Sequence, residues 1–357
     1  MSGTPINSEE IIGTLNDGSG VKAFTLRNKN GSEARFYNLG AAFVGFRLPD
    51  MTDEESLVLG CDTLEAFIAQ NANFGATIGR YANRIGHGKT HINGQALELE
   101  CNSGGHHLHG GSDGFGHRVW NSQINLEKDE PNLVFTLTSP DGDANYPGEL
   151  TITQRIRLTD DDEVIIAYEA ATTKTTLVNL TNHAYFNLAG AAAGSLKDHE
   201  FRVHSDTVTG IDATLLPTGE LVPVENTALD LRDWRPIDQA LESLNDPSLA
   251  RAGSYDHNYV FGTEMERPLT LMAEARHEPS GRWMRCSSTL PGLQFYSGGF
   301  MGGTPRNETD IYQRHGAFCM EPGAWPDSPN HDHFPDCTLT PEQTYRATLV
   351  FGFGQKS

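Results

Sequence analysis

Several short segments of this sequence combine glycine, asparagine, histidine and charged residues within apolar surroundings. They are residues 79–85 (GRYANRI), 102–111 (NSGGHHLHGG), 179–188 (NLTNHAYFNL), 255–259 (YDHNY) and 319–330 (CMEPGAWPDSPN). Aromatic rings pack against the apolar faces of a sugar ring, whereas the sugar hydroxyl groups need fixed donors and acceptors. This mixture of side chains therefore suits a sugar-binding site.

Two histidine pairs in or near these segments suggest an alternative, a metal site. His107-x-His109 and His331-x-His333 would each place two imidazoles on one face of a strand. Zinc or iron could use such a pair together with a carboxylate. The simpler interpretation, polar histidines in loops, is the one we adopt. The five cysteines include no CxxC pair, which argues against a structural zinc site and a disulfide framework. We therefore expect no metal ion.

Strands are the elements that must position these segments. Residues 345–353 (YRATLVFGF) have a period of two, so one face of the strand should carry Tyr345, Ala347, Leu349, Phe351 and Phe353. Similar runs separated by turn residues occur at residues 133–138, 151–158 and 163–170.

Turns and helices complete the expected architecture. Asn30-Gly31 and Asn93-Gly94 suit two-residue hairpin loops, because both residue types tolerate positive φ. Helix is expected only at residues 236–244, starting at Pro236, and at residues 62–69. No βαβ alternation is present. The sequence thus predicts an all-β protein, one large antiparallel β-sandwich domain over residues 1–357 with a few short helices.

The overall charge limits the classes of partner. The formal net charge is −21, and no cluster of Lys and Arg offsets it, so nucleic acid and anionic membrane surfaces should be repelled. No stretch approaches the roughly 20 apolar residues of a membrane span. The first ten residues have neither the basic nor the apolar region of a secretory signal. We expect a cytoplasmic protein, monomeric or homodimeric.

Eight landmarks, in order along nearly the whole chain, resemble the galactose mutarotase (aldose 1-epimerase) family. They are GRYANRI, LHGG, GFGHRVW, LTNHAYFNL, LPTGE, YDHN, PGLQFYSGGF and GAFCMEP. The resemblance implies a galactose mutarotase-like sandwich that binds its sugar in an open groove without a cofactor. It also implies an isomerase that interconverts the α and β anomers of free hexoses, galactose or glucose.

The family's functional residues correspond to positions in these landmarks. The resemblance implies that Glu321 is the general base and His183 the general acid. The implied sugar contacts are Asn83, Arg84, His109, Asp256 and Gln294. Tyr185 and Trp325 could either stack on the sugar or fill the core.

The reaction explains why one carboxylate and one imidazole suffice. A base takes the proton of the C1 hydroxyl while an acid protonates the ring oxygen, the C1–C2 bond rotates, and the roles reverse on closure. Ordinary pKa values are about 4.3 for Glu and about 6.5 for His. They predict a bell-shaped pH profile with its acid limb from Glu321 and its alkaline limb from His183.

Some positions depart from the family pattern. Gly323 stands where the family often has Gln, and Gly105-His106-His107 stands where it often has a GPN-like run. Gly116 replaces a frequent Asp. These departures affect the expected sugar preference and a hydrogen bond near Glu321.

Two further alternatives use the same scaffold. A hexose-phosphate 1-epimerase would need additional Arg or Lys beside the phosphate, and no such cluster is visible. A non-catalytic sugar-binding protein could have lost Glu321 or His183, and both are present.

Overall fold

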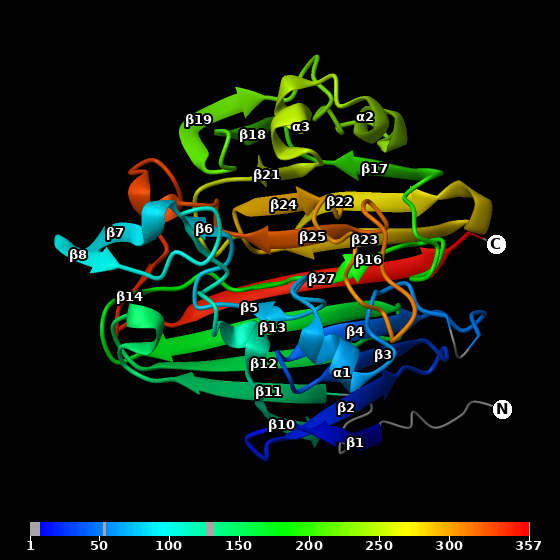
Figure 1. The fold of residues 1–357 in the computed structure, drawn as a ribbon, viewed down its shortest axis with the longest axis horizontal. Coiled ribbons are helices and arrows are strands. Elements are labelled where there is room, and N and C mark those ends of the chain that lie inside the picture. Colours follow the sequence, from blue (N-terminus) through cyan, green and yellow to red (C-terminus); the bar gives the residue numbers. More distant parts are fainter. Residues whose placement is uncertain (1–7, 53–54, 126–131, 357) are drawn as a thin grey trace.

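A nine-stranded antiparallel sheet forms one layer of the protein (Figure 1). The computed structural model describes residues 8–52, 55–125 and 132–356. In order across the sheet, the strands are β10 (Asn121–Asn125), β11 (Asn132–Ser139), β12 (Leu150–Leu158), β13 (Glu163–Thr172), β27 (Tyr345–Gln355), β23 (Arg282–Ser288), β22 (Thr270–His277), β17 (His199–Val203) and β20 (Arg235–Pro236). The four strands expected from sequence are confirmed as β11, β12, β13 and β27, which lie side by side.

Two smaller antiparallel sheets form the second layer. One comprises β1 (Ser8–Thr14), β2 (Gly20–Arg27), β3 (Glu33–Tyr37) and β4 (Ala42–Arg47). The other, six-stranded, runs β16 (Tyr185–Phe186), β25 (Phe318–Gly323), β24 (Gly292–Tyr296), β21 (Asp256–Val260), β18 (Thr207–Ile211) and β19 (Pro217–Pro223). The ring centroids of Phe46 and Phe353 lie 4.0 Å apart, and those of Phe318 and Phe201 lie 4.9 Å apart, so both smaller sheets pack on the large one. The predicted β-sandwich is confirmed.

The alternation of side chains explains this packing. Residues of β12 are alternately buried and exposed or half-exposed, as in a sheet with one face on the core and one toward solvent. On β27, all five residues predicted to share a face lie in the apolar core. In β25, by contrast, every residue is buried: Phe318 and Met320 belong to the core, whereas Cys319 and Glu321 point to the opposite face. The outer face of the six-stranded sheet is therefore covered as well.

Four short strand pairs complete the strands of the described residues. They are β14 (Thr176–Leu177) with β26 (Thr338–Leu339), β15 (Thr181–Asn182) with β5 (Thr77–Ile78), β6 (Arg84–Ile85) with β9 (His107–Leu108), and β7 (Lys89–Ile92) with β8 (Gln95–Glu98). Asn93-Gly94 joins β7 to β8 with φ of 52° and 76°, which confirms the predicted two-residue loop.

The other predicted hairpin exists, but its loop is longer than two residues. The loop between β2 and β3 spans residues 28–32, and Gly31 alone has positive φ, 94°, within it. The reason is the side chain of Asn28, whose Oδ1 accepts hydrogen bonds from the backbone N–H groups of Asn30 (3.1 Å) and Ser32 (3.0 Å). An Asx side chain here organises a wider turn than the Asn-Gly pair alone would form.

In the described residues, three short α-helices occur, α1 (Leu64–Ala69), α2 (Asp238–Ser243) and α3 (Pro247–Ala252). Helix α2 begins later than predicted, because Pro236 pairs with Glu200 in β20 instead of opening the helix. Helix α3 was not predicted, although Asp246 at its N-cap and Pro247 at its first position are a standard start signal. None of these helices has the length and apolar character needed to cross a membrane.

The first prediction concerns the core between the sheets. Phe351 of β27 is fully buried, and its ring lies 5.3 Å from that of Phe186 and 6.4 Å from that of Phe43. Phe351→Ala should lower the free energy of unfolding by about 3–5 kcal/mol, because it leaves a cavity between both layers. Urea unfolding measures this change. Arg346→Ala on the same strand removes only an exposed ion pair and should stay within about 0.5 kcal/mol of wild type; equal effects of the two substitutions would contradict the packing described.

Candidate active site

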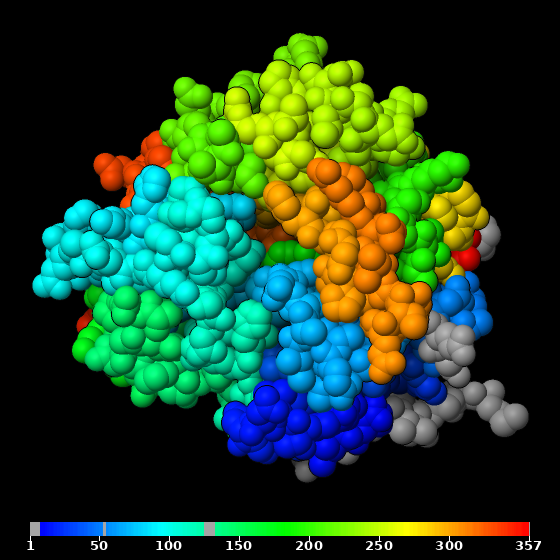
Figure 2. All heavy atoms as spheres, viewed as in Figure 1, coloured from blue at the N-terminus to red at the C-terminus, as the bar shows by residue number. Residues whose placement is uncertain are grey.

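All seven residues expected to contact or transform a sugar line one pocket of about 300 Å³. They come from segments far apart in the sequence, namely residues 83–84, 109, 183, 256, 294 and 321. Figure 2 shows the hollow at the centre of this face, between the light-blue, cyan and orange segments. The pocket lies over the outer face of the six-stranded sheet. The structure thus brings together every predicted site residue; the role of each remains a proposal.

The register of the six-stranded sheet arranges the pocket floor in two rows. Gln294 of β24 pairs with Asn258 of β21 on one side and with Glu321 of β25 on the other. Two residues along, the second row runs from Tyr185 through Cys319 and Tyr296 to Asp256. Because directly paired residues of antiparallel strands share a face, both rows point into the pocket side of the sheet.

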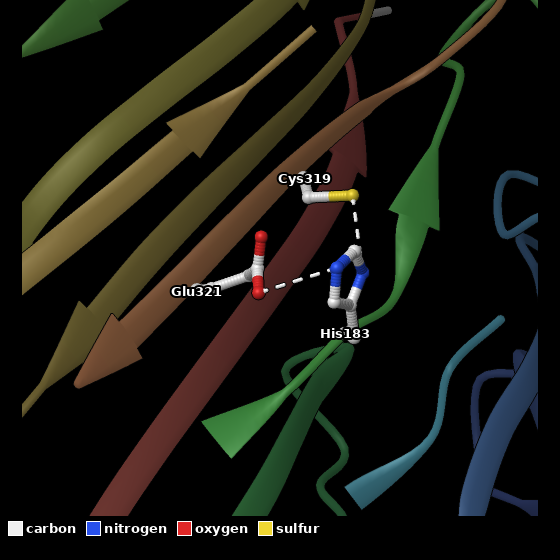
Figure 3. Close-up of side chains that lie close together, drawn as sticks. All are labelled: His183, Cys319 and Glu321. Carbon is white, nitrogen blue, oxygen red and sulfur yellow. Dashed lines mark hydrogen bonds and ion pairs between the residues drawn. The ribbon is translucent and has the colours of Figure 1, made fainter. Parts of the chain in front are cut away.

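His183 stands beside both rows, in the turn between β15 and β16 (Figure 3). Its backbone is fixed by two hydrogen bonds, from His183 N–H to Ala76 O (2.9 Å) and from Gly75 N–H to His183 O (3.0 Å). Its ring stacks on Tyr185, with centroids 5.0 Å apart. The Nε2 atom lies 3.5 Å from Glu321 Oε2, and both side chains are buried, at 7% and 6% exposure. An acid and a base therefore face each other at the bottom of the pocket.

The surroundings of Glu321 disfavour its ionised form. Burial and the nearby carboxylate of Asp256 raise the pKa of Glu321 well above its usual value, while Arg84 acts in the opposite direction. Burial likewise raises the pKa of Asp256, although Arg84 and a hydrogen bond from Gln294 Nε2 to its Oδ1 (2.6 Å) lower it. Two acidic groups thus share a pocket wall with a single guanidinium among the described lining residues.

The pKa of His183 shifts in the direction that burial imposes on a basic group. Burial lowers the pKa of His183 to about 4, because the imidazolium form loses its hydration. This order of pKa values contradicts the prediction made from ordinary values, since the group with the higher pKa is Glu321. The pair titrates as a unit, and its singly protonated form spans the range between the two pKa values. The acid limb should follow His183 and the alkaline limb Glu321.

His109 is held as a neutral donor. Its ring Nδ1 accepts a hydrogen bond from the backbone N–H of Asn83 (3.2 Å), and the backbone N–H of His109 donates to Asn83 O (3.0 Å). Burial and the neighbouring His183 lower the pKa of His109 well below its usual range. With Nδ1 as acceptor, the proton of the neutral ring resides on Nε2. Gly110 permits this arrangement: its φ is 84°, and a Cβ there would lie 1.9 Å from Gly79 O.

The structure also identifies pocket residues that the sequence interpretation missed. Tyr296 and Phe300 line one wall with rings 6.4 Å apart, and Phe300 is 69% exposed at the rim. The signal that could have identified them is the period of two of a strand, in which residues two apart share a face. Tyr296 lies two residues beyond Gln294, and Cys319 lies two residues before Glu321. Tyr185 lines the pocket as well. The other lining residues not predicted are Asn71, Ala72, Asn73, Ser103, Leu108 and Thr304.

Trp325, the other aromatic left open, is a core residue. It is 1% exposed, its Nε1 donates to Pro291 O (3.1 Å), and its ring contacts Phe334 at 4.9 Å. Arg80 of the GRYANRI landmark is also structural, because its guanidinium donates to backbone carbonyls such as Gly148 O at 2.9 Å.

Asn179 occupies the space beside the glycine that departs from the family pattern. A Cβ on Gly323 would lie 3.3 Å from Asn179 Oδ1. That oxygen accepts a hydrogen bond from Ala324 N–H (2.9 Å), and Asn179 Nδ2 donates to Ala82 O (3.1 Å). Asn179 thereby ties the end of β25 to the segment that carries Asn83. A hydrogen-bonding side chain is thus present near Glu321 despite Gly323.

Of the two histidine pairs considered as metal ligands, the structure separates His107 from His109, whereas the rings of His331 and His333 lie 6.1 Å apart. His107 ends up with both ring nitrogens engaged, Nδ1 with Glu100 O (2.8 Å) and Nε2 with the Tyr146 hydroxyl (2.7 Å). Its neighbour His109 lies in the pocket instead of on the same strand face, because β9 ends at Leu108 and His109 has a φ of 53°. Neither these two nor His331 and His333 belong to a possible three-ligand metal cluster within the described ranges.

The chain is similar to known proteins along nearly its whole length. The aldose 1-epimerase family model matches residues 22–352. Galactose mutarotase of Sus scrofa is 35% identical over 349 residues, covering 97% of this chain and 98% of the relative. Aldose 1-epimerase of Escherichia coli K12 is 35% identical over 341 residues, covering 94% and 96% of the two chains.

Solved structures match over nearly the whole length. A galactose 1-epimerase from Lactobacillus acidophilus superposes with a TM-score of 0.87 at 23% identity, covering 99% of this chain and 100% of the other. A GalM/aldose epimerase homologue from C. elegans gives a TM-score of 0.81 at 26% identity, covering 98% and 100%. The sandwich and the position of its strands are therefore those of these proteins.

The second prediction tests the two side-chain hydrogen bonds of Asn179 beside Gly323. Asn179→Ala would leave two buried backbone groups without partners, and should lower the free energy of unfolding by about 2–3 kcal/mol in urea titrations. Asn330→Ala is the control: Asn330 Nδ2 donates to Lys89 O (3.0 Å) at an exposed position where water can replace the side chain. Its cost should be below about 1 kcal/mol. A loss at position 330 as large as at position 179 would contradict the structural role given to Asn179.

Proposed function

The chain belongs to the aldose 1-epimerase family of isomerases, and on that premise we propose that Glu321 and His183 interconvert the α and β anomers of a free hexose, galactose or glucose. The observation that carries the proposal is the 3.5 Å separation between His183 Nε2 and Glu321 Oε2 at the bottom of the pocket. The assignment of residues 1–357 to one domain, the cytoplasmic location and the monomeric or homodimeric state remain predictions.

Proximity of the acid and the base is a requirement of the reaction. The C1 hydroxyl oxygen and the ring oxygen are both bonded to C1, so the groups that exchange protons with them must lie side by side. Glu321 takes the C1 hydroxyl proton as His183 donates a proton to the ring oxygen, and the ring opens to the aldehyde. After rotation about C1–C2, His183 recovers its proton from the C5 hydroxyl, and Glu321 returns one to the carbonyl oxygen.

The reactive form of the pair has an ionised Glu321 and a protonated His183. It carries the same single proton as the form in which both groups are neutral, so the two forms interconvert without uptake of a proton. Arg84 favours the ionised form, because its guanidinium lowers the pKa of Glu321. Burial opposes it, and bound sugar hydroxyls would replace part of the lost hydration.

The other lining groups provide the hydrogen bonds that a hexose needs. His109 Nε2 and the Arg84 guanidinium are donors, and the Asp256 carboxylate is an acceptor. Gln294 keeps its Oε1 free of protein partners while buried, which leaves it for a hydroxyl donor. Asn83 joins the set through its side chain in the pocket wall. Tyr185 and Tyr296 supply apolar surface for the sugar ring.

The pocket charge favours a neutral sugar over a sugar phosphate. Among the described lining residues, Arg84 is the one Lys or Arg, and it stands with two carboxylates, Glu321 and Asp256. Because Glu321 and His183 together hold one proton, Asp256 alone balances Arg84, and the described pocket lining has no spare positive charge to pair with a phosphate dianion. The alternatives of a hexose-phosphate epimerase and of a non-catalytic sugar-binding protein are decided by the measurement below.

The third prediction is that the protein accelerates mutarotation and that Glu321→Gln and His183→Asn do not. Loss of either proton-transfer group should lower kcat by about 10²–10⁴-fold. Polarimetry of freshly dissolved α-D-galactose and α-D-glucose measures the decay of rotation, and the faster sugar ranks the substrates. Trp325→Phe, a change in the core outside the pocket, is the control and should retain activity if it folds. Sugar binding without acceleration by wild type would leave only the binding protein, and activity restricted to glucose 6-phosphate would establish the phosphate epimerase.

The fourth prediction concerns pH. The alkaline limb of kcat/KM marks loss of the last proton from the pair, so it follows the raised pKa of Glu321. Asp256→Asn removes a charge that raises this pKa and should move the limb to lower pH; Arg84→Gln removes a charge that lowers it and should move the limb to higher pH. Polarimetric rates, corrected for the spontaneous reaction, give both profiles. Shifts in the same direction would contradict the assignment of the alkaline limb to Glu321.

A further inference from the structure

A cysteine thiol completes a cluster of metal-binding side chains around the proposed acid and base. Cys319 Sγ lies 3.7 Å from His183 Nδ1, and Glu321 Oε2 lies 3.5 Å from His183 Nε2 (Figure 3). One donor atom from each of the three lies within 4.8 Å of the others, and the described parts of the chain contain no second group of this kind. The sugar chemistry proposed above makes no use of the thiol.

The donor set and its spacing suit zinc. Thiolate, imidazole and carboxylate bind Zn²⁺ at about 2.0–2.3 Å, and three protein ligands with an open fourth position are an established arrangement. In such a tetrahedron the ligand atoms lie roughly 3.5 Å apart, and the three donor atoms here, with one nitrogen of His183, all lie within 4.8 Å of one another. The ion needs one imidazole nitrogen, so the side chains must adjust to bring that nitrogen, the thiol and the carboxylate closer together.

The position of the cluster gives an ion both access and attraction. His183 and Glu321 line the open pocket, whereas Cys319 lies beneath them and is fully buried. Asp256, on the same wall, adds a second carboxylate, and Arg84 is the one opposing guanidinium among the described lining residues. A divalent cation would relieve the repulsion between the two carboxylates. The thiolate ligand favours Zn²⁺ over the hard cations Mg²⁺ and Ca²⁺.

We propose that Cys319, His183 and Glu321 form an inhibitory Zn²⁺ site that competes with the sugar. Binding converts the thiol to a thiolate and also displaces the one proton that Glu321 and His183 hold between them, so two protons pass to water as the sulfur–zinc, nitrogen–zinc and oxygen–zinc bonds form. The ion occupies a lone pair of His183 and an oxygen of Glu321, so neither group can exchange a proton with a hexose. The inhibitory consequence rests on the proposed function; the binding itself does not.

The binding is tested with Co²⁺ as a spectroscopic substitute for Zn²⁺, on metal-stripped full-length protein. Wild type should show a near-ultraviolet thiolate-to-cobalt charge-transfer band that Zn²⁺ abolishes and galactose diminishes. Cys319→Ser should lose the band and weaken Co²⁺ binding by at least about 100-fold, since even outer-shell changes cost 10–100-fold. Cys101→Ser, at an exposed cysteine, is the matched control and should retain the band.

Two further measurements make the test independent of whether Cys319→Ser folds and of whether the protein catalyses mutarotation. Glu321→Gln retains the thiol and the shape of the site, so it should weaken Co²⁺ binding even if Cys319→Ser does not fold. Zn²⁺ should inhibit wild-type mutarotation competitively with sugar. Absence of the band in wild type, or its persistence in Cys319→Ser, would overturn the proposal. A band with no mutarotation by metal-free protein would instead refute the proposed function and leave the metal site in place.

Discussion

The burial of Glu321 on the outer face of the six-stranded sheet is the constraint on which the rest of the site depends. A carboxyl group removed from water needs either a proton or a compensating charge. Here the adjacent imidazole of His183 and the guanidinium of Arg84 offer the charge, while Asp256 opposes ionisation. The sum of these effects raises the pKa of Glu321 and places the proton of the pair on its carboxyl group. A pair that holds one proton suits a reaction in which the proton must leave and return at each turnover.

The β-sandwich permits the burial of Glu321 because it fixes the surrounding backbone. Strands β24 and β25 are buried on both faces, with the core of the sandwich on one side and the pocket on the other. Loop segments that carry Asn83 and His109 close over the outer face through reciprocal hydrogen bonds, and Asn179 ties the first of them to β25. The proposed acid, base and sugar contacts thus stand on strands and loops that hydrogen bonds tie together, which favours fixed separations before a ligand binds.

Much of this arrangement could be predicted from the sequence, because strand periodicity and family landmarks are local signals. The alternation in residues 345–353 gave both the strand and its buried face. The sequence did not predict local conformations that depend on contacts between several segments. Asn28 widened a hairpin turn, Pro236 joined a strand instead of a helix, and His109 turned away from His107 at the end of β9. Each outcome follows from a partner that is distant in sequence or from a side-chain hydrogen bond.

The order of the pKa values of Glu321 and His183 is the clearest case of a property that the residue types alone misstate. Ordinary values place the proton on histidine, because imidazole is the stronger base in water. Burial reverses the order, since it penalises the charged form of each group and so lowers one pKa and raises the other. The same low-dielectric environment strengthens the attraction of the carboxylate pair for a cation. The pocket proposed to move one proton between Glu321 and His183 is thus, by the same physics, suited to the metal ion proposed above, and the thiol of Cys319 adds a ligand that favours a soft one.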